Sequence, residues 1–246
     1  MPKAPLVPRP ASTLILTRDT STGLEVFMMQ RTHQAVFMPG YFVFPGGAVD
    51  PADTSASMLA RCQGIEGLAL SCALALEQDG LAYAVAAIRE SFEEVGLLLA
   101  YDAQGDYVQI AEPGDIAYYA GLRERLYTGQ LTFADVFQQR GLTAAIDQLA
   151  LFSRWITPVG LPRRYDTRFF VAAAPERQIA VPDGQEAIDH IWVAPAAALE
   201  QGRQGALALS EPTMRTLEDI AAFTTTEALI SYARKQGPMQ PTGSVL

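Results

Sequence analysis

The stretch from about Leu81 to Val95 has the most regular pattern in this chain of 246 residues. Apolar residues recur along it with the spacing of a helix, which turns by roughly 100° per residue. One side of that helix holds the apolar residues Val85, Ile88, Phe92 and Val95. The opposite side holds the acids Glu90, Glu93 and Glu94. The sequence therefore predicts a helix that packs by one face and presents three carboxylates on the other.

Three carboxylates this close on one helix repel one another, by a few tenths of a kcal/mol per pair when exposed and by more when partly buried. A bound cation removes this cost, and ligands that are all oxygen suit Mg²⁺ or Mn²⁺. Arg89 directly precedes the acids and is placed to pair with Glu93, while Gly96 permits a tight exit from the helix. This context favours a metal site over a merely solvated acidic face.

The residues from Arg89 to Leu97 resemble the second half of the Nudix box, Arg-Glu-x-x-Glu-Glu-x-Gly followed by an aliphatic residue. Gly47 resembles the glycine that opens the box. The resemblance implies an α+β fold, a Nudix-type α/β/α sandwich with a mixed β-sheet and additional helical insertions. It also implies a hydrolase that cleaves a diphosphate linkage.

By the same resemblance, oxygen ligands of this chain would hold one or more Mg²⁺ ions, with Mn²⁺ as a substitute. The expected ligands are Glu90, Glu93, Glu94 and the carbonyl group of Gly47. Arg89 joins the three glutamates in the expected catalytic set. The metal would neutralise diphosphate oxygens and stabilise charge on the leaving phosphate. One carboxylate would serve as the base for the attacking water, and the sequence leaves open which one.

The chain departs from the box at three places. Arg89 follows Gly47 by 42 residues, whereas the box places its arginine 14 residues after the glycine, so roughly 28 additional residues intervene. Asp53 stands where the box has its first glutamate, and Ser91 replaces the usual aliphatic residue. The half of the box that bears the metal ligands is intact.

A second stretch, from Arg31 to Gly47, resembles the upstream signature of coenzyme A diphosphatases. The spacing matches at Arg31, Thr32, Gly40 and Phe44. The resemblance implies that the substrate is coenzyme A or acyl-coenzyme A, a small nucleotide derivative, and that Arg31 and His33 contact it. That signature carries an arginine where this chain has Val36, so hydrolysis of NADH or ADP-ribose stays an open alternative.

A third stretch, between Trp155 and Phe170, resembles the insertion-bearing branch of the family that includes peroxisomal coenzyme A diphosphatases. It contains a basic cluster, Arg163, Arg164 and Arg168. Guanidinium groups match the oxygens of phosphate, so Arg163 and Arg164 are expected to bind substrate phosphates. Arg168 is the one most suited to a structural role. The alternative for the cluster is ion pairing with nearby acids such as Asp166.

Glu186 lies in a loop just before a predicted strand, where members of the family carry an additional catalytic carboxylate. We expect it to be catalytic, and a solvated loop acid is the alternative. His190 is expected on the face of that strand. A different class of protein also stays open, a catalytically silent Nudix-fold module that binds a nucleotide or a partner protein. The presence of all three box glutamates argues against it.

The balance of 18 basic and 27 acidic residues gives a net charge of −9, which disfavours nucleic acid as a partner. The chain has two cysteines, Cys62 and Cys72, which we expect to be buried free thiols in a reducing compartment. No stretch approaches the roughly 20 apolar residues of a membrane span. These features predict a cytoplasmic protein that does not contact membranes, and they leave a homodimer open.

The chain is expected to form a single Nudix hydrolase domain over residues 1–246, with helical insertions at about 53–80 and 116–149 and a flexible tail at 237–246. Patterns of strand-forming residues predict strands at 11–17, 24–30, 41–44, 154–157, 168–173 and 190–193. Helices are expected near 81–95, 211–223 and 227–236, with two or three short helices between 116 and 149 that break at Gly121, Gly129 and Gly141.

Overall fold

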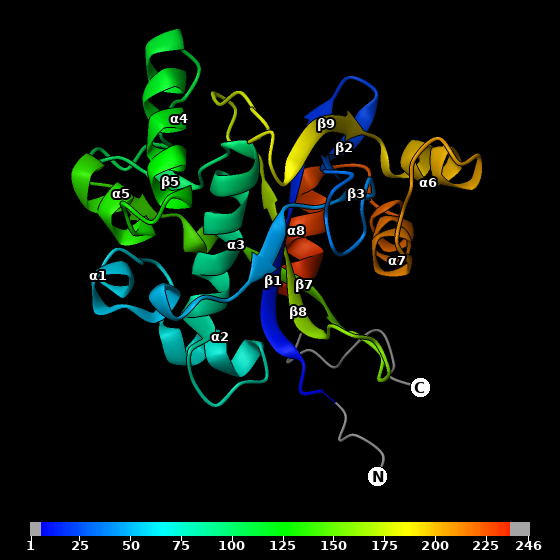
Figure 1. Ribbon diagram of the computed structural model, residues 1–246, viewed down its shortest axis with the longest axis horizontal. Coiled ribbons are helices and arrows are strands. Elements are labelled where there is room, and N and C mark those ends of the chain that lie inside the picture. The colour runs from blue at the N-terminus through cyan, green and yellow to red at the C-terminus, as the bar shows by residue number, and fades with distance from the viewer. Residues whose placement is uncertain (1–5, 237–246) are drawn as a thin grey trace.

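The computed structural model describes residues 6–236, and a mixed β-sheet lies at their centre (Figure 1). Within this range the sheet has seven strands: β1 (Arg9–Thr20), β2 (Gly23–Arg31), β3 (Phe42–Val43), β4 (Gly46–Ala48), β7 (Ala150–Ile156), β8 (Tyr165–Ala173) and β9 (Ala187–Val193). The main order is β3-β2-β1-β8-β7, with β4 paired to β1 and β9 paired to β2. β1 and β8 run parallel, and the other pairs are antiparallel. The sheet is mixed because it combines one parallel pair of strands with antiparallel pairs.

Each face of the sheet packs on its own hydrophobic core, because side chains alternate between the two faces of a strand. Along β1, Leu14 and Leu16 belong to one core and Ile15 to the other. The first core is covered by α1 (Ala56–Leu59), α2 (Gly67–Ala73), α3 (Gly80–Val95), α4 (Pro113–Tyr127) and α5 (Phe133–Arg140). The second is covered by α6 (Pro195–Arg203), α7 (Glu211–Ile220) and α8 (Thr226–Arg234). In Figure 1 the helices α1–α5 lie to the left of the sheet and α6 and α7 to the right, while α8 overlaps the strands in this view. Helices on both faces of the sheet confirm the predicted α/β/α sandwich.

The smaller elements occupy the connections on the α3 side. They are the 3₁₀ turns η1 (Pro51–Thr54) and η2 (Ile146–Gln148) and a two-stranded sheet of β5 (Ala100–Tyr101) and β6 (Thr143–Ala144). The predicted insertions at about 53–80 and 116–149 contain α1 and α2, and most of α4 together with α5, respectively. Their status as insertions in one domain stays a prediction.

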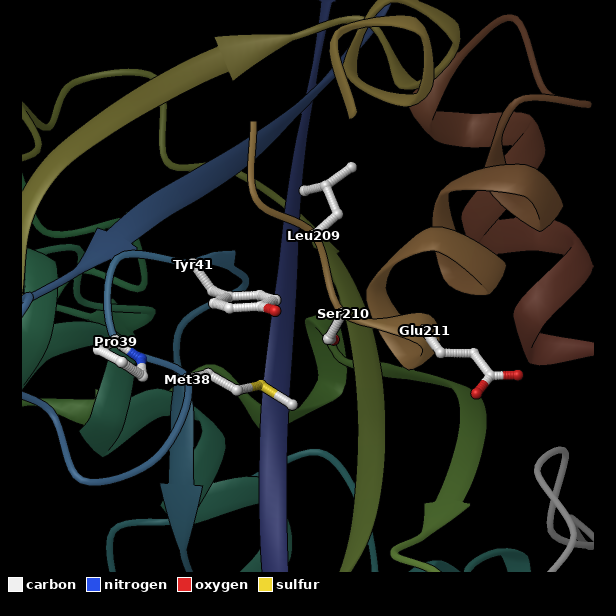
Figure 2. A pocket seen from close by; sticks show the side chains of 6 residues that line it. All are labelled: Met38, Pro39, Tyr41, Leu209, Ser210 and Glu211. Carbon is white, nitrogen blue, oxygen red and sulfur yellow. The ribbon is translucent and has the colours of Figure 1, made fainter. Parts of the chain in front are cut away.

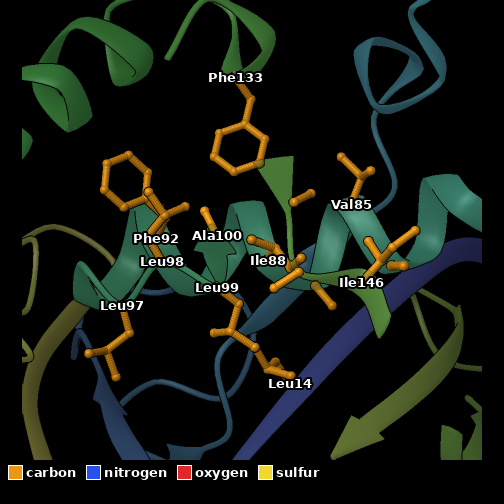
Figure 3. Packing of buried hydrophobic residues seen from close by; sticks show 14 of the residues in the cluster. Leu14, Val85, Ile88, Phe92, Leu97, Leu98, Leu99, Ala100, Phe133 and Ile146 are labelled. Carbon is orange, nitrogen blue, oxygen red and sulfur yellow. The ribbon is translucent and has the colours of Figure 1, made fainter. Parts of the chain in front are cut away.

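The apolar face predicted for residues 81–95 packs as expected (Figure 3). Ile88 and Phe92 are fully buried, and the Phe92 ring lies 6.2 Å from Phe133 and 6.1 Å from Tyr119, measured between ring centroids. Burying a side chain of this size stabilises the fold by about 1.5–3 kcal/mol. This packing fixes α3 against the first core and leaves its acidic side facing the sheet at β4.

Several local predictions differ from the structure, among them the starts of β7 and β8, which begin at Ala150 and Tyr165 rather than at 154 and 168. Gly121 does not break a helix, because α4 runs through it, whereas Gly129 and Gly141 follow the ends of α4 and α5. The predicted strand at 41–44 contains only β3, and the glycines after it form β4 instead of a turn. The strand predicted from His190 begins at Ala187. Helix α6 was not predicted.

No helix within residues 6–236 has both the length and the apolar composition needed to cross a bilayer. The predicted flexible tail at 237–246 lies outside the described residues.

The two cysteines are free thiols, as predicted, but only one is even partly buried. Cys72 is exposed, so the expectation of burial is wrong there, while Cys62 is partly buried. Burial raises the pKa of the Cys62 thiol to about 11, which leaves about one thiolate per thousand molecules at pH 8. Alkylation of the native protein at pH 8 should therefore label Cys72, with Cys62 reacting only after unfolding. Peptide mass spectrometry distinguishes the two, and equal labelling rates would contradict this assignment.

Candidate metal and catalytic site

The acidic side of α3 lies directly against the two glycines of β4. β4 pairs with β1, with Gly47 opposite Ser12. A Cβ atom on Gly47 would lie only 2.5–2.6 Å from the carboxyl atoms of Glu90. The neighbouring Gly46 N–H donates a hydrogen bond of 2.9 Å to Glu94 Oε2. Glycine at position 47 is therefore what allows the backbone and the acidic helix to approach so closely.

Glu94 is the most buried of the three acids, with only 3% of its surface exposed. One carboxylate oxygen accepts the bond from Gly46, but the other, Oε1, is buried without a hydrogen-bond partner. Burial raises the pKa of Glu94 well above its usual value, and repulsion from Glu90 raises it further. A buried, unpaired carboxylate oxygen is costly unless a cation compensates it. This unpaired oxygen is the observation that best fits a cation-binding role for Glu94.

The other two acids share this environment to a smaller degree. Burial raises the pKa of Glu90 to about 7, and burial also raises the pKa of Glu93, whose side chain is 33% exposed. Glu186 is exposed in the loop before β9, and its negative charge contributes to the raised pKa of Glu90, Glu93 and Glu94 alike. The fold thus brings Glu186 close to the acids of α3, and its catalytic role stays a prediction.

Arg89 is the hub of this acidic group. Its Nε and Nη2 atoms donate to the two carboxylate oxygens of Asp53 at 2.9 and 3.1 Å, and Nη2 also donates to the Ala48 carbonyl at 2.9 Å. Its Nη1 atom donates to Glu90 at 2.8 Å and to Glu93 at 3.2 Å. The predicted pairing of Arg89 with Glu93 is thereby confirmed as one contact among several.

Asp53 is 1% exposed and occupies the 3₁₀ turn that follows β4. The additional residues between Gly47 and Arg89 therefore run away from the site after Asp53, and the chain returns to it at α3. The two halves of the box are in contact as a result. Sequence reasoning noted the acid at this position but did not foresee its ion pair with Arg89, because the pairing spans 36 residues. The acid that replaces the first glutamate of the box is held in place by the arginine of the second half.

The donor atoms fit a hard divalent cation, although the side chains do not enclose one as they stand. Among residues 6–236, no three His, Cys, Asp or Glu side chains converge closely enough to hold an ion. The reason is visible in the contacts, because Glu90 and Glu93 both turn toward Arg89 Nη1. Each of these two carboxylates contacts Nη1 through one oxygen only, so its second oxygen is available to an ion. Oxygen ligands and the orphaned Glu94 oxygen suit Mg²⁺ or Mn²⁺.

The two residues predicted to contact substrate from the upstream signature organise the loop between β2 and β3. Arg31 Nε donates to the Phe37 carbonyl at 3.2 Å, and the positive charge of Arg31 partly offsets the raised pKa of Glu94. The His33 ring lies over Gly40, where a Cβ atom would come within 2.8 Å of His33 Nδ1. Arg31 is thus near the acidic group, and the substrate contacts of both residues stay predictions.

An open pocket lies between this loop and the start of α7 (Figure 2). It is lined by Met38, Pro39, Tyr41, Leu209, Ser210 and Glu211. None of the acids of α3 contributes to its wall. The pocket is therefore not lined by the proposed metal ligands of α3.

The predicted phosphate-binding cluster is divided by the fold. Arg163 is exposed, and its predicted role is untested. The guanidinium of Arg164 is buried and donates to the carbonyls of Thr157 and Leu6. That geometry ties two backbone segments together and speaks against the predicted phosphate contact of Arg164. Arg168 is fully buried and pairs with Asp166, which confirms the structural role expected for it.

Comparison with known proteins agrees with this fold. The family model for the NUDT19 Nudix domain matches residues 71–220, which is more than half of the chain. The chain therefore belongs to the Nudix family. Within that family, the matching model is the one described for the NUDT19 domain, and its match begins after Gly47 and Asp53.

Individual relatives point the same way. The chain is 27% identical to the acyl-coenzyme A diphosphatase NUDT19 of Gallus gallus over 85% of its own length, and 28% identical to that of Homo sapiens over 82%. It spans about 64% and 61% of those two relatives. The crystal structure of a Nudix hydrolase from Alicyclobacillus acidocaldarius superposes with a TM-score of 0.77 at 28% identity, covering 96% of this chain and 99% of that one. The predicted Nudix fold is confirmed.

Proposed function

We propose that this chain is a metal-dependent hydrolase that cleaves the diphosphate linkage of a nucleoside diphosphate derivative. The observation that carries the proposal is the buried Glu94 carboxylate, held by Gly46 on one oxygen and unpaired on the other, beside Glu90 and Glu93. A buried carboxylate with one unpaired oxygen, beside two further carboxylates, is suited to bind a cation. The cation would in turn attract a diphosphate.

The described residues have separable roles in this proposal. Glu90, Glu93, Glu94 and Gly47 would hold Mg²⁺ or Mn²⁺, which when bound supplies charge neutralisation and a more acidic water. Arg89 orients Glu90 and Glu93 and keeps Asp53 paired. The oxygen of water forms a bond to one phosphorus atom as the bridging P–O bond breaks. A nearby carboxylate, for which Glu186 is one candidate, accepts the proton of that water.

Coenzyme A or acyl-coenzyme A is the proposed substrate class. The support is the upstream signature around Arg31 and the activity for which the chicken and human relatives are named, acyl-coenzyme A diphosphatase. Cleavage would give adenosine 3′,5′-bisphosphate and a phosphopantetheine. Val36, exposed in the loop after β2, replaces an arginine of that signature. Because of this replacement, NADH or ADP-ribose is the second candidate.

A substrate panel tests the proposal. The purified protein is assayed with coenzyme A, an acyl-coenzyme A, NADH and ADP-ribose, each with Mg²⁺, with Mn²⁺ and with a chelator. We expect turnover with either metal, none with the chelator, and the highest kcat/KM for a coenzyme A compound. Preference for NADH or ADP-ribose would overturn the substrate class alone. If no substrate is cleaved, the silent nucleotide-binding module becomes the better description.

Gly47→Ala should impair the metal site without unfolding the protein. The added Cβ meets the Glu90 carboxylate, so that side chain must leave its position. Displacing a ligand or its support typically costs 10- to 100-fold in metal affinity or activity, and we expect a loss of about that size in kcat/KM with Mg²⁺. Gly121→Ala is the matched control, because nothing lies within 4 Å of its added Cβ. Equal activity in the two variants would contradict the proposed proximity of Gly47 and Glu90.

A further inference from the structure

The carboxyl end of α3 is secured by groups from outside the helix. The Phe92 carbonyl accepts the N–H of Gly96, whose φ of 75° closes the helix. The next carbonyl oxygens have partners far along the chain: Glu94 O accepts the Asp183 N–H at 3.0 Å, and Val95 O accepts the Val181 N–H at 2.8 Å. The last turn of α3 carries two of the proposed ligands, so whatever fixes these carbonyls also fixes the ligands.

The remaining carbonyl, that of Glu93, is bound by an arginine from α4. Arg123 Nε and Nη2 donate to Glu93 O at 3.1 and 2.8 Å, and Nη1 donates to Val181 O at 2.7 Å. The residue is only 9% exposed. A Cβ atom on Gly96 would lie 3.1 Å from Nη1, so the glycine that ends α3 also leaves room for this guanidinium.

Arg123 acts on backbone atoms, which is an unusual use of a buried arginine in an acidic neighbourhood. Its charge lies close enough to Asp183, Glu93 and Glu94 to interact with all three carboxylates, yet its hydrogen bonds go to carbonyl oxygens. A cation at the carboxyl end of a helix also interacts favourably with the helix dipole. The planar fork of a guanidinium can bridge two carbonyls in a fixed geometry, which a lysine cannot reproduce.

The second carbonyl bound by Arg123 belongs to the segment that leads to Glu186. In that segment the Asp183 carboxylate accepts the N–H groups of Glu186 and Ala187 at 3.0 and 2.8 Å. A continuous set of contacts therefore runs from Arg123 through Val181 and Asp183 to Glu186. The same guanidinium holds the end of α3 on one side and the Glu186 loop on the other.

We propose that Arg123 is a positioning residue of the active site, which sets the Glu186 loop in register with the last turn of α3. The proposal rests on the proposed hydrolytic function and gives α4 a role in it beyond packing. Arg123 touches neither the expected ligand oxygens nor the substrate. Its effect on catalysis passes through the backbone of Glu93 and Val181.

Three variants test this role in the full chain. Arg123→Lys keeps the positive charge but loses the fork, and Arg123→Met removes both. Arg125→Met is the matched control, because Arg125 is exposed on the same helix. For each folded variant, verified by circular dichroism, we measure kcat and KM with saturating Mg²⁺ on the best substrate of the panel. We also measure Mn²⁺ affinity by electron paramagnetic resonance and hydrogen exchange of the peptide covering residues 177–186.

The expected result is a fall in kcat of about tenfold for Arg123→Lys and about 100-fold for Arg123→Met, the range typical of residues that support metal ligands. KM should change by less than about twofold, because the residue does not contact substrate. Mn²⁺ affinity should weaken by at least several-fold, and exchange in 177–186 should quicken. Arg125→Met should match the unmodified protein in all of these measurements.

Other outcomes decide against the proposal. Folded Arg123 variants with unchanged kcat and unchanged Mn²⁺ affinity would overturn it and leave Arg123 as a packing residue. If Arg123→Met does not fold, Arg123→Lys alone decides by the same criteria. If the unmodified protein binds Mn²⁺ but cleaves no substrate of the panel, the Mn²⁺ affinity of Arg123→Lys decides. If it neither binds Mn²⁺ nor cleaves any substrate, the proposed function fails, and the role of Arg123 fails with it.

Discussion

Glu94→Gln is expected to lower metal-dependent hydrolysis by a factor of about 10³, which corresponds to about 4 kcal/mol of transition-state stabilisation. Glu94 is the most buried of the proposed ligands, and its free oxygen has no protein partner to replace a cation. A glutamine presents a neutral amide where a charged oxygen is needed, while keeping the size of the side chain. The measurement is kcat/KM with Mg²⁺ on the best substrate of the panel.

The same substitution should have the opposite effect on stability when metal is absent. Because burial raises the pKa of Glu94 above its unfolded value, the folded protein holds more protons than the unfolded chain between those two pKa values. Stability of the metal-free protein from this group is therefore lost as the pH rises. Glu94→Gln removes that loss, so the metal-free variant should equal or exceed the unmodified protein in urea denaturation at pH 8.

Glu77→Gln serves as the control, because Glu77 is exposed ahead of α3. It should change neither turnover nor the urea midpoint. If Glu94→Gln retained more than a tenth of the activity, Glu94 could not be a principal metal ligand. If it destabilised the metal-free protein by more than the control, the raised pKa of Glu94 would have been misjudged.

The sequence was most informative where structure is determined locally. α3 begins and ends within a residue of its predicted bounds, because its apolar spacing and its closing glycine lie within the helix or next to it. β1 and β2 were also found, since each has a dense run of strand-forming residues around a short turn. The motif around Arg89 then identified the acids that the fold gathers.

Interactions between distant segments were the part that the sequence could not supply. The apolar and acidic faces of α3 predicted an acidic face that is accessible to a metal ion. Glu94 is instead buried, because β4 lies against that side of α3. β4 itself is only a glycine-rich triplet, and it becomes a strand through its pairing with β1. Arg123 gave no signal at all, because nothing near it in the chain indicates that its partner is the Glu93 carbonyl.

The resulting site contains one cation of the protein itself, the Arg89 guanidinium. By our proposal it binds a second cation, the metal ion. Arg89 Nη1 neutralises Glu90 and Glu93 in the structure as it stands, while Asp53 keeps the rest of that guanidinium in place. Each of these carboxylates is paired with Arg89 through one oxygen, so its other oxygen can bind an incoming ion. Asp53 holds the Arg89 guanidinium in place through both carboxylate oxygens, whether or not an ion is bound to the two glutamates.

Arg89→Met should destabilise the protein more than the loss of any exposed arginine. The substitution strands the Asp53 carboxylate, which is 1% exposed and pairs with Arg89 through both oxygens. Removing one partner of a buried ion pair typically costs about 3–5 kcal/mol, because the other charge remains buried and uncompensated. Urea denaturation in the presence of a chelator measures this loss without a contribution from metal.

Two further variants separate the buried pair from a general effect of removing charge. Arg18→Met breaks the exposed pair with Glu25 and should cost at most about 1 kcal/mol. Asp53→Asn combined with Arg89→Met removes the stranded charge, so the double variant should be more stable than Arg89→Met alone. A loss for Arg89→Met no greater than that for Arg18→Met would mean that Asp53 does not depend on Arg89. A double variant less stable than Arg89→Met would mean that the stranded carboxylate is not the source of the cost.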